Sequence, residues 1–131
     1  GHIDIIEFLI KEKAPLEAVT HDLWTPLHGA SSSGQTEAVE LLLQHGANLY
    51  HQSLDEKTAL HRACQGGHVE TARALLQRAG ADIHARSHID EWQPIHFSAL
   101  AGNAECVELC LKYGAQVNAR TQSGQTPLHH A

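Results

Sequence analysis

The sequence contains no methionine and few aromatic residues. Only 5% of the 131 residues are Phe, Trp or Tyr, whereas 42% are hydrophobic. Any core should therefore be a shallow layer of Leu, Val, Ile and Ala, which suits a solenoid better than a globule. No apolar stretch approaches the roughly 20 residues that cross a bilayer, and no secretory leader is visible. Because methionine is missing, we expect this chain to be a piece of a longer protein.

Basic residues and cysteines are also scarce. Nine Lys and Arg against fifteen Asp and Glu give a formal net charge of −6. This charge disfavours a nucleic-acid partner, because sequence-independent binding needs clustered positive side chains. Three cysteines without paired spacing argue against a disulfide framework and favour a reducing compartment. We therefore expect an intracellular protein, cytoplasmic or nuclear.

One four-residue phrase occurs four times in nearly the same form. The copies are Thr25-Pro26-Leu27-His28, Thr58-Ala59-Leu60-His61, Gln93-Pro94-Ile95-His96 and Thr126-Pro127-Leu128-His129. They are 33, 35 and 33 residues apart. A fixed period of this size is typical of a stacked array, in which each unit buries its apolar face only against its neighbours.

Each copy predicts the first of two helices. A threonine can cap a helix, and a proline fits the first helical position because its missing N–H costs nothing there. In the first whole unit a second helix should follow from about Thr36 to His45 and end at Gly46. Gly1 to Ile10 read like the second helix of a partial unit. We therefore predict one array over 1–131, with partial repeats at 1–19 and 121–131 and full repeats at 20–52, 53–86 and 87–120.

These phrases resemble the motifs of the ankyrin repeat family, which run T-P-L-H-x-A, then G-H-x-E, then G-A-D-V-N-A. Thr25 to Ala30, Thr58 to Ala63 and Thr126 to Ala131 match the first motif, Gly67 to Glu70 the second, and Gly114 to Ala119 the third. The resemblance covers the whole chain. It implies an all-α solenoid of helix-turn-helix units linked by β-hairpin-like loops. It also implies a scaffold that binds a protein or peptide and catalyses nothing.

The resemblance further implies that partner contacts come from the hairpin tips and from the exposed side of each first helix. Transferred position by position, the tips hold His21, Asp22, Trp24, Leu54, Asp55, Lys57, His88, Ile89, Glu91, Trp92, Gln122 and Gln125. The first helices add Arg62, Gln65, Phe97 and Leu100.

Both tryptophans directly precede a copy of the recurring phrase, two units apart. Tryptophan is enriched among interface hot spots, which favours exposed binding roles for Trp24 and Trp92. The alternative is that each indole folds over its own hairpin and shields the joint between units. Acidic residues at the tips would steer a partner with a basic surface, unless they are simply solvated; they are Asp22, Asp55, Glu56, Asp90 and Glu91.

The histidines of the recurring phrase could suggest a metal or catalytic site. However, successive copies belong to different units, and no H-E-x-x-H spacing occurs. We interpret His28, His61, His96 and His129 as residues that hydrogen-bond backbone groups at the joints between units.

Two of the cysteines, Cys106 and Cys110, lie four residues apart on one predicted helix and could form half of a metal site. A partner pair is lacking, and Cys110 occupies a position where other units have leucine, so we expect core packing there and at Cys64. No nucleophile and base stand at a recognisable spacing. We therefore predict no catalytic residue, no metal and no cofactor.

Two other functions remain open. Trp24 and Trp92 could stack on a small ligand or single-stranded nucleic acid while Lys57 and Arg62 contact phosphate, although the overall acidity counts against this. The array could instead be a structural spacer in a larger enzyme or channel.

Several residues depart from the family pattern at the turns. The hairpin glycine survives only as Gly124, so the other tips must turn differently or place an ordinary residue at positive φ. Lys13 takes the place of Gly46 in the first partial unit. One extra residue lies within 87–92, so the third hairpin should protrude further than the others.

Overall fold

The computed structural model describes residues 2–131, which form helices and loops with no strand among them. The helices are α1 (His2–Lys11), α2 (Pro26–Ser32), α3 (Thr36–Gln44), α4 (Ala59–Gln65), α5 (Val69–Ala79), α6 (Pro94–Leu100), α7 (Ala104–Lys112) and α8 (Pro127–His130). The predicted all-α class is thus confirmed; Gly1, which the sequence assigned to the first helix, lies outside the described residues. Of the described helices none is long and apolar enough to cross a membrane, and the longest has 11 residues.

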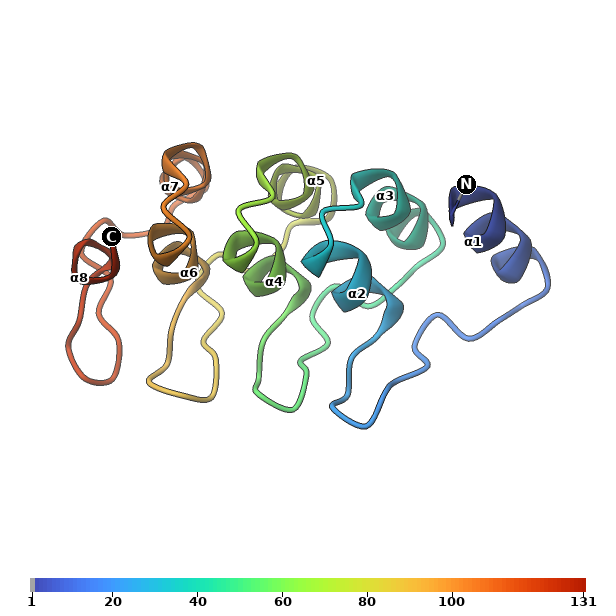
Figure 1. The fold of residues 1–131 in the computed structure, drawn as a ribbon, viewed down its shortest axis with the longest axis horizontal. Coiled ribbons are helices and arrows are strands. Elements are labelled where there is room, and N and C mark those ends of the chain that lie inside the picture. The colour runs from blue at the N-terminus through green and yellow to red at the C-terminus, as the bar shows by residue number, and fades with distance from the viewer. Residues whose placement is uncertain (1) are drawn as a thin grey trace.

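The helices stand in two parallel rows (Figure 1). One row contains α2, α4, α6 and α8, and the other contains α1, α3, α5 and α7, so that the two ends of the chain lie at opposite ends of the array. Each helix packs against the next member of its own row, and α2, α4 and α6 also pack against α3, α5 and α7 respectively. The core is therefore a thin layer shared between successive helix pairs, as a stacked array requires.

The recurring phrase begins each first helix as expected. Thr25 has an extended backbone, its hydroxyl accepts a hydrogen bond from the backbone N–H of His28, and Pro26 occupies the first turn. At the other end of a unit, Gly80 adopts a left-handed conformation with φ 70° and its N–H bonds to the carbonyl of Leu75. Lys13 reaches a similar conformation, φ 62°, without being glycine. The first helix therefore ends without the usual glycine, as the sequence indicated.

Equivalent positions of successive units form the core. Leu27, Leu60 and Ile95 all follow the first residue of the recurring phrase by two positions, and each is at most 1% exposed. Leu42, Leu75 and Cys110 share a position on the second helices and are buried as well. The core thus repeats with the period of the sequence.

Three histidines of the recurring phrase, His28, His61 and His96, join adjacent units. Nδ1 of His28 accepts a hydrogen bond from the N–H of Thr25 at 3.2 Å, so Nε2 carries the proton and donates to the carbonyl of Lys57 at 3.0 Å. His61 repeats this geometry, with its Nε2 donating to the carbonyls of Ala85 and Trp92 at 3.0 and 3.1 Å. The predicted structural role is thus confirmed for His28, His61 and His96, whereas His129 bonds to the N–H and hydroxyl of Thr126 at its own helix start.

Burial of the rings of His28, His61 and His96 disfavours their charged form. It lowers the pKa of His28 and His96 below the usual 6.5, and it lowers the pKa of His61 to about 4. At neutral pH each ring is uncharged, which is the state that lets Nδ1 accept the hydrogen bond at its helix start.

All three cysteines are free and buried, which confirms the expected core packing. Cys64 on α4 interacts with Cys106 and Cys110 on α7, and these neighbouring thiols together with burial raise the pKa of Cys64. The sequence separates Cys64 from the other two by more than one unit and did not indicate that the three thiols meet.

Candidate partner-binding surface

Four hairpin loops project from one side of the array (Figure 1). We define them as residues 20–24, 53–57, 87–92 and 121–125. In each loop the N–H of the first residue donates a hydrogen bond to the carbonyl of the last residue. The pairs are Thr20 to Trp24 at 3.0 Å, Ser53 to Lys57 at 3.0 Å, Ser87 to Trp92 at 3.0 Å and Thr121 to Gln125 at 2.9 Å. Each loop is therefore closed by its own backbone, and the residues between are available to shape the tip.

Backbone hydrogen bonds also connect neighbouring tips. The N–H of Leu54 donates to the carbonyl of Asp22 at 2.8 Å, that of His88 donates to Asp55 at 3.0 Å, and that of Gln122 donates to Asp90 at 2.9 Å. In the second tip the donor Leu54 and the acceptor Asp55 are consecutive residues. In the third tip Ile89 stands between the donor His88 and the acceptor Asp90. Ile89 is therefore the extra residue of the third hairpin, and its side chain is 77% exposed.

The tips without glycine place ordinary residues at positive φ. The values are 59° for Leu23, 56° for Glu56, 58° for Asp90 and 51° for Glu91. Gly124, the one hairpin glycine, has φ 83°. The tips therefore keep a left-handed turn and accept its steric cost, which is the second of the two outcomes that the sequence allowed.

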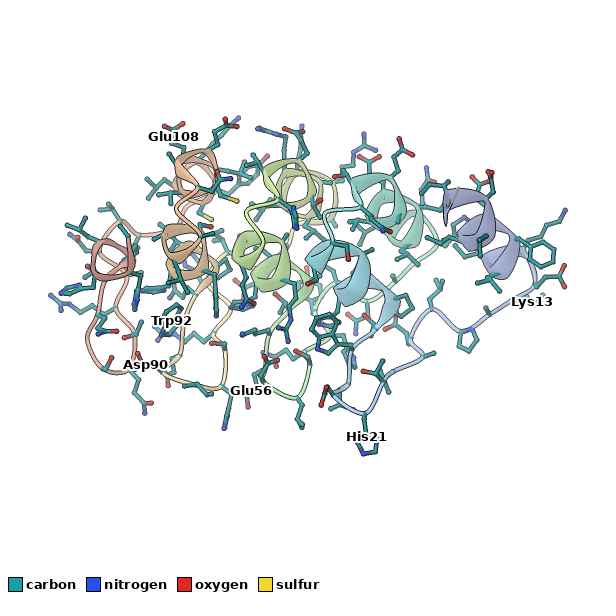
Figure 2. All side chains as sticks on the ribbon, in the orientation of Figure 1. Lys13, His21, Glu56, Asp90, Trp92 and Glu108 are labelled. Carbon is teal, nitrogen blue, oxygen red and sulfur yellow. The ribbon has the colours of Figure 1, made fainter. Side chains whose placement is uncertain are left out.

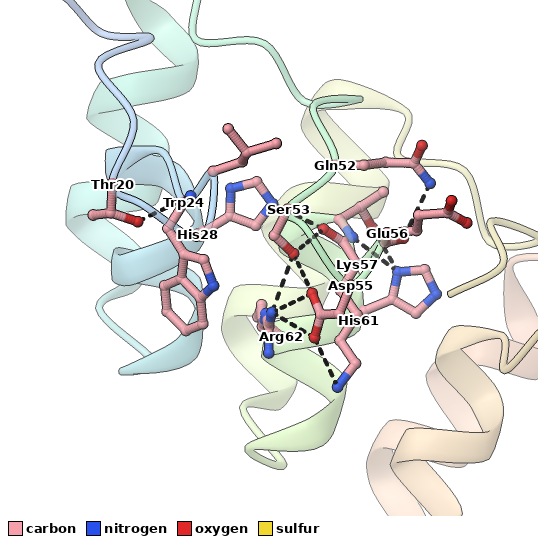
Figure 3. A network of polar contacts seen from close by, with 12 residues as sticks. Thr20, Trp24, His28, Gln52, Ser53, Asp55, Glu56, Lys57, His61 and Arg62 are labelled. Carbon is pink, nitrogen blue, oxygen red and sulfur yellow. Dashed lines mark hydrogen bonds and ion pairs between the residues drawn. The ribbon is translucent and has the colours of Figure 1, made fainter. Parts of the chain in front are cut away.

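A polar cluster centred on Asp55 connects the second hairpin to helix α4 (Figure 3). Nη2 of Arg62 donates to both carboxylate oxygens of Asp55 at 2.7 and 2.9 Å, and Nζ of Lys57 lies 3.3 Å from the same group. The Ser53 hydroxyl donates to it at 2.5 Å. Burial alone would raise the pKa of Asp55, but these donors and cations lower it to about 2.

Trp24 is half-buried and forms a contact between two units. The guanidinium carbon of Arg62 lies 4.3 Å from the centre of its indole ring. The same ring lies beside His28, with 6.2 Å between ring centres. One face of the indole is thus covered by the chain itself, and the rest borders the surface between the first two hairpins.

Trp92 is also half-buried and packs against the core. Its ring centre lies 4.0 Å from that of His130 and 5.0 Å from that of Phe97, and its Nε1–H donates to Asp90 at 3.2 Å. This is the arrangement expected if the indole shields the joint between units. Only part of Trp92 remains available to a partner.

Two hollows lie side by side between the hairpins and share Asp55. The first, which we call the Trp24 hollow, has a volume of about 430 Å³ and is lined by Asp22, Trp24, Leu54, Asp55, Arg62 and His88. The second, the Ile89 hollow, has a volume of about 400 Å³ and is lined by Asp55, Lys57, Ser87, Ile89, Asp90, Trp92, Phe97 and Leu100. Together they collect eleven of the predicted contact residues onto one surface.

The remaining predicted residues lie outside the hollows. His21, Gln65, Gln122 and Gln125 are exposed, and Glu91 is half-buried and bonded to Arg86 at 2.7 Å. The structure corrects the exposure expected for Phe97: its side chain is only 6% exposed, because Trp92 and Lys57 fold over its ring. Phe97 therefore forms the floor of the Ile89 hollow.

Ser87 lines the Ile89 hollow and Ser53 bonds to Asp55, although the sequence did not single out either serine. A signal existed, since Thr20, Ser53, Ser87 and Thr121 place a hydroxyl at the first residue of every hairpin. Within residues 2–131, no group of three or more His, Cys, Asp or Glu side chains could hold a metal ion.

Comparison with known proteins finds similarity over short segments. The chain is 51% identical over 37 residues to protein phosphatase 1 regulatory subunit 27 of Homo sapiens and of Mus musculus, which is 28% of this chain and 24% of each relative. It is 47% identical over 36 residues to the ADP-ribosylation factor GTPase-activating protein AGD1 of Arabidopsis thaliana, 28% of this chain and 4% of the relative. The chain therefore matches at most about a quarter of these curated relatives.

Two family descriptions match successive parts of the chain. "Ankyrin repeats (3 copies)" matches residues 1–87, and "Ankyrin repeats (many copies)" matches residues 87–131. The first match alone covers more than half of the sequence, and the two-row stack of helix pairs agrees with both. Such repeats typically act as protein-interaction modules. The chain belongs to the ankyrin repeat family.

Proposed function

We propose that this chain is a non-catalytic interaction module that binds a peptide or a folded protein at its hairpin surface. We define the hairpin surface as the Trp24 hollow, the Ile89 hollow and the tips around them. The observation that carries the proposal is the pair of adjoining hollows, because they combine exposed apolar side chains with fixed polar groups. A regulatory subunit of a phosphatase among the relatives agrees with a binding role.

The exposed apolar residues support this choice of surface. Leu54 is 65% exposed, Ile89 77% and Leu100 55%, and all three line the hollows. Large apolar side chains that gather on one surface, rimmed by polar groups, mark sites of interaction with other proteins.

The arrangement of cations counts against a ligand or nucleic-acid sensor. Arg62 and Lys57 both bind Asp55, so neither is free to meet a phosphate. Trp24 already stacks on Arg62, and Trp92 on His130 and Phe97. Each indole therefore already has an aromatic or cationic partner within the chain, which reduces the surface that such a sensor could offer to a base.

A capture experiment tests the proposal. The purified chain would be immobilised, incubated with cell extract, and the retained proteins identified by mass spectrometry for the wild type and for Ile89→Lys and Leu54→Lys. Both substitutions place a charge on an exposed position and leave the core intact. We expect partners of the wild type to be lost from both variants.

Val117→Lys is the matched control, because Val117 is 63% exposed and lies outside the hairpin surface. It should retain the same partners as the wild type. If the hairpin variants and the control retain the same proteins, the hairpin surface is not where the chain binds.

A further inference from the structure

The Ile89 hollow is an apolar recess whose rim carries the exposed side chain of Ile89. Its floor is the buried ring of Phe97, and its walls include Trp92 and the exposed Leu100 of α6. Ile89 is present only because the third hairpin has one residue more than the others, and this residue is the second most exposed of the large apolar side chains. The insertion therefore adds apolar surface where a partner side chain could be enclosed.

The carboxylates at the tips fall into two groups. Asp55 is paired with Arg62 and Lys57, and Glu91 is paired with Arg86. Three others have no Lys or Arg partner among residues 2–131. They are Asp22, which is exposed, Glu56, which lies 3.6 Å from His88, and Asp90, which accepts hydrogen bonds from Ser123 and Trp92.

These three carboxylates come from three successive hairpins, and Figure 2 shows Glu56 and Asp90 at the tips of neighbouring loops. The helices behind the tips contribute almost no charge, because Arg62 is the sole Lys, Arg, Asp or Glu of α2, α4, α6 and α8. The surface is thus acidic at the tips and apolar toward the helices.

From this pattern we propose that the hairpin surface binds a basic, amphipathic peptide segment. A large apolar side chain of the segment enters the Ile89 hollow, and its Lys or Arg side chains face Asp22, Glu56 and Asp90. The inference rests on the proposed function and adds the chemistry of the partner. Apolar burial provides most of the affinity, whereas the uncompensated charges select for basic residues and speed association.

A random 12-residue peptide library displayed on phage, selected against the chain, would test the inference. The enriched peptides would be synthesised and their affinities measured by fluorescence polarisation at low and high salt. We expect them to share a large apolar residue flanked by Lys or Arg. Ile89→Ser should weaken binding roughly tenfold, equivalent to about 1.4 kcal/mol.

The double variant Asp22→Asn, Glu56→Gln should weaken binding about threefold at low salt and reduce its salt dependence, because screened interactions between exposed charges are lost. Val117→Ser is the control and should bind like the wild type. Circular dichroism would establish that every variant is folded.

The outcomes separate the two proposals. Acidic or uncharged peptides whose binding is lost in Ile89→Ser would overturn the present inference and leave the proposed function standing. Failure to enrich any peptide would overturn the present inference and leave the binding of a folded protein standing. Enrichment of peptides that bind every hairpin variant equally would overturn both.

Discussion

Arg62 holds its guanidinium 4.3 Å from the centre of the Trp24 indole, so a helix of one unit supports the hairpin of the unit before it. The same guanidinium bonds to Asp55 in its own unit, and its side chain is only 10% exposed. One residue therefore fixes two neighbouring hairpins at once. This makes the Trp24 hollow a pre-formed site, since its two walls are bonded to a common residue.

A double-mutant cycle on Trp24 and Arg62 should reveal this coupling. We expect Trp24→Ala and Arg62→Ala to lower the free energy of unfolding by less in combination than the sum of the single changes. The coupling should be on the order of 1 kcal/mol, because the pair is partly desolvated. Urea denaturation of the four proteins measures it. Strictly additive effects would show that the stacked geometry does not stabilise the fold.

The third copy of the recurring phrase offers a stabilising substitution. The hydroxyls of Thr25, Thr58 and Thr126 lie 2.9, 3.0 and 2.8 Å from Nδ1 of the histidine three residues on. Gln93 replaces this threonine, and its Oε1 is buried without a hydrogen-bond partner. Unpaired buried polar atoms are costly.

Gln93→Thr should therefore raise the free energy of unfolding by about 1 kcal/mol, as an improved helix cap does. Thermal or urea unfolding would measure the change. The reciprocal substitution Thr58→Gln serves as the control and should destabilise the protein. A lower stability of Gln93→Thr would mean that the glutamine makes a contribution that this geometry does not explain.

Acid should destabilise the array at pH values that are still above those at which carboxylates titrate. The pKa of His61 is about 4 in the folded chain against 6.5 in the unfolded chain, so between these values the unfolded state binds more protons. Stability is fully present above pH 6.5 and is lost as the pH falls toward 4. The loss from His61 is on the order of 3 kcal/mol, and His28 and His96 act in the same direction.

Urea midpoints measured from pH 7.5 to pH 4.5 would test this expectation. Asp55 does not interfere, because its pKa is lowered from 3.8 to about 2 and its contribution is lost only below this window. His61→Gln should be less stable at pH 7 but less sensitive to pH. A midpoint that is constant over the window would contradict the assigned neutral state of the buried rings.

The left-handed turn at Leu23 should be improved by glycine. Leu23 has φ 59° and its side chain is 40% exposed, so Leu23→Gly removes a steric cost and little buried surface. We expect a gain of roughly 0.5 kcal/mol in the free energy of unfolding. Gly124→Ala is the reverse test at φ 83° and should lower the free energy of unfolding by about 1 kcal/mol. Equal stabilities of all three proteins would show that these tips relax freely.

The sequence predicted the features that depend on local, repeated chemistry. The same short phrase creates the same local geometry where it recurs. It starts helices at Thr25 and Thr58, and it places the rings of His28 and His61 to bond to the next unit. A period observed several times is strong support for a stacked array, and the family matches agree.

Contacts between units were harder to predict. The position of Phe97 within the repeat places it on a first helix, but this position does not show that Trp92 and Lys57 cover its ring. Likewise, spacing alone does not bring Cys64 to Cys106 and Cys110. Such contacts depend on side-chain rotamers and on how far one unit is rotated against the next, and neither is encoded in a repeat pattern.

Every pair of neighbouring tips shares a bond that runs from main chain to main chain, as between Leu54 and Asp22 and between His88 and Asp55. Between the third and fourth tips, the Asp90 carboxylate adds bonds to Ser123. Residues at the other tip positions can therefore be exchanged during evolution without breaking the main-chain bonds of the row. A new partner specificity could arise through a few substitutions or a single insertion, as at Ile89, while the framework that displays it stays unchanged.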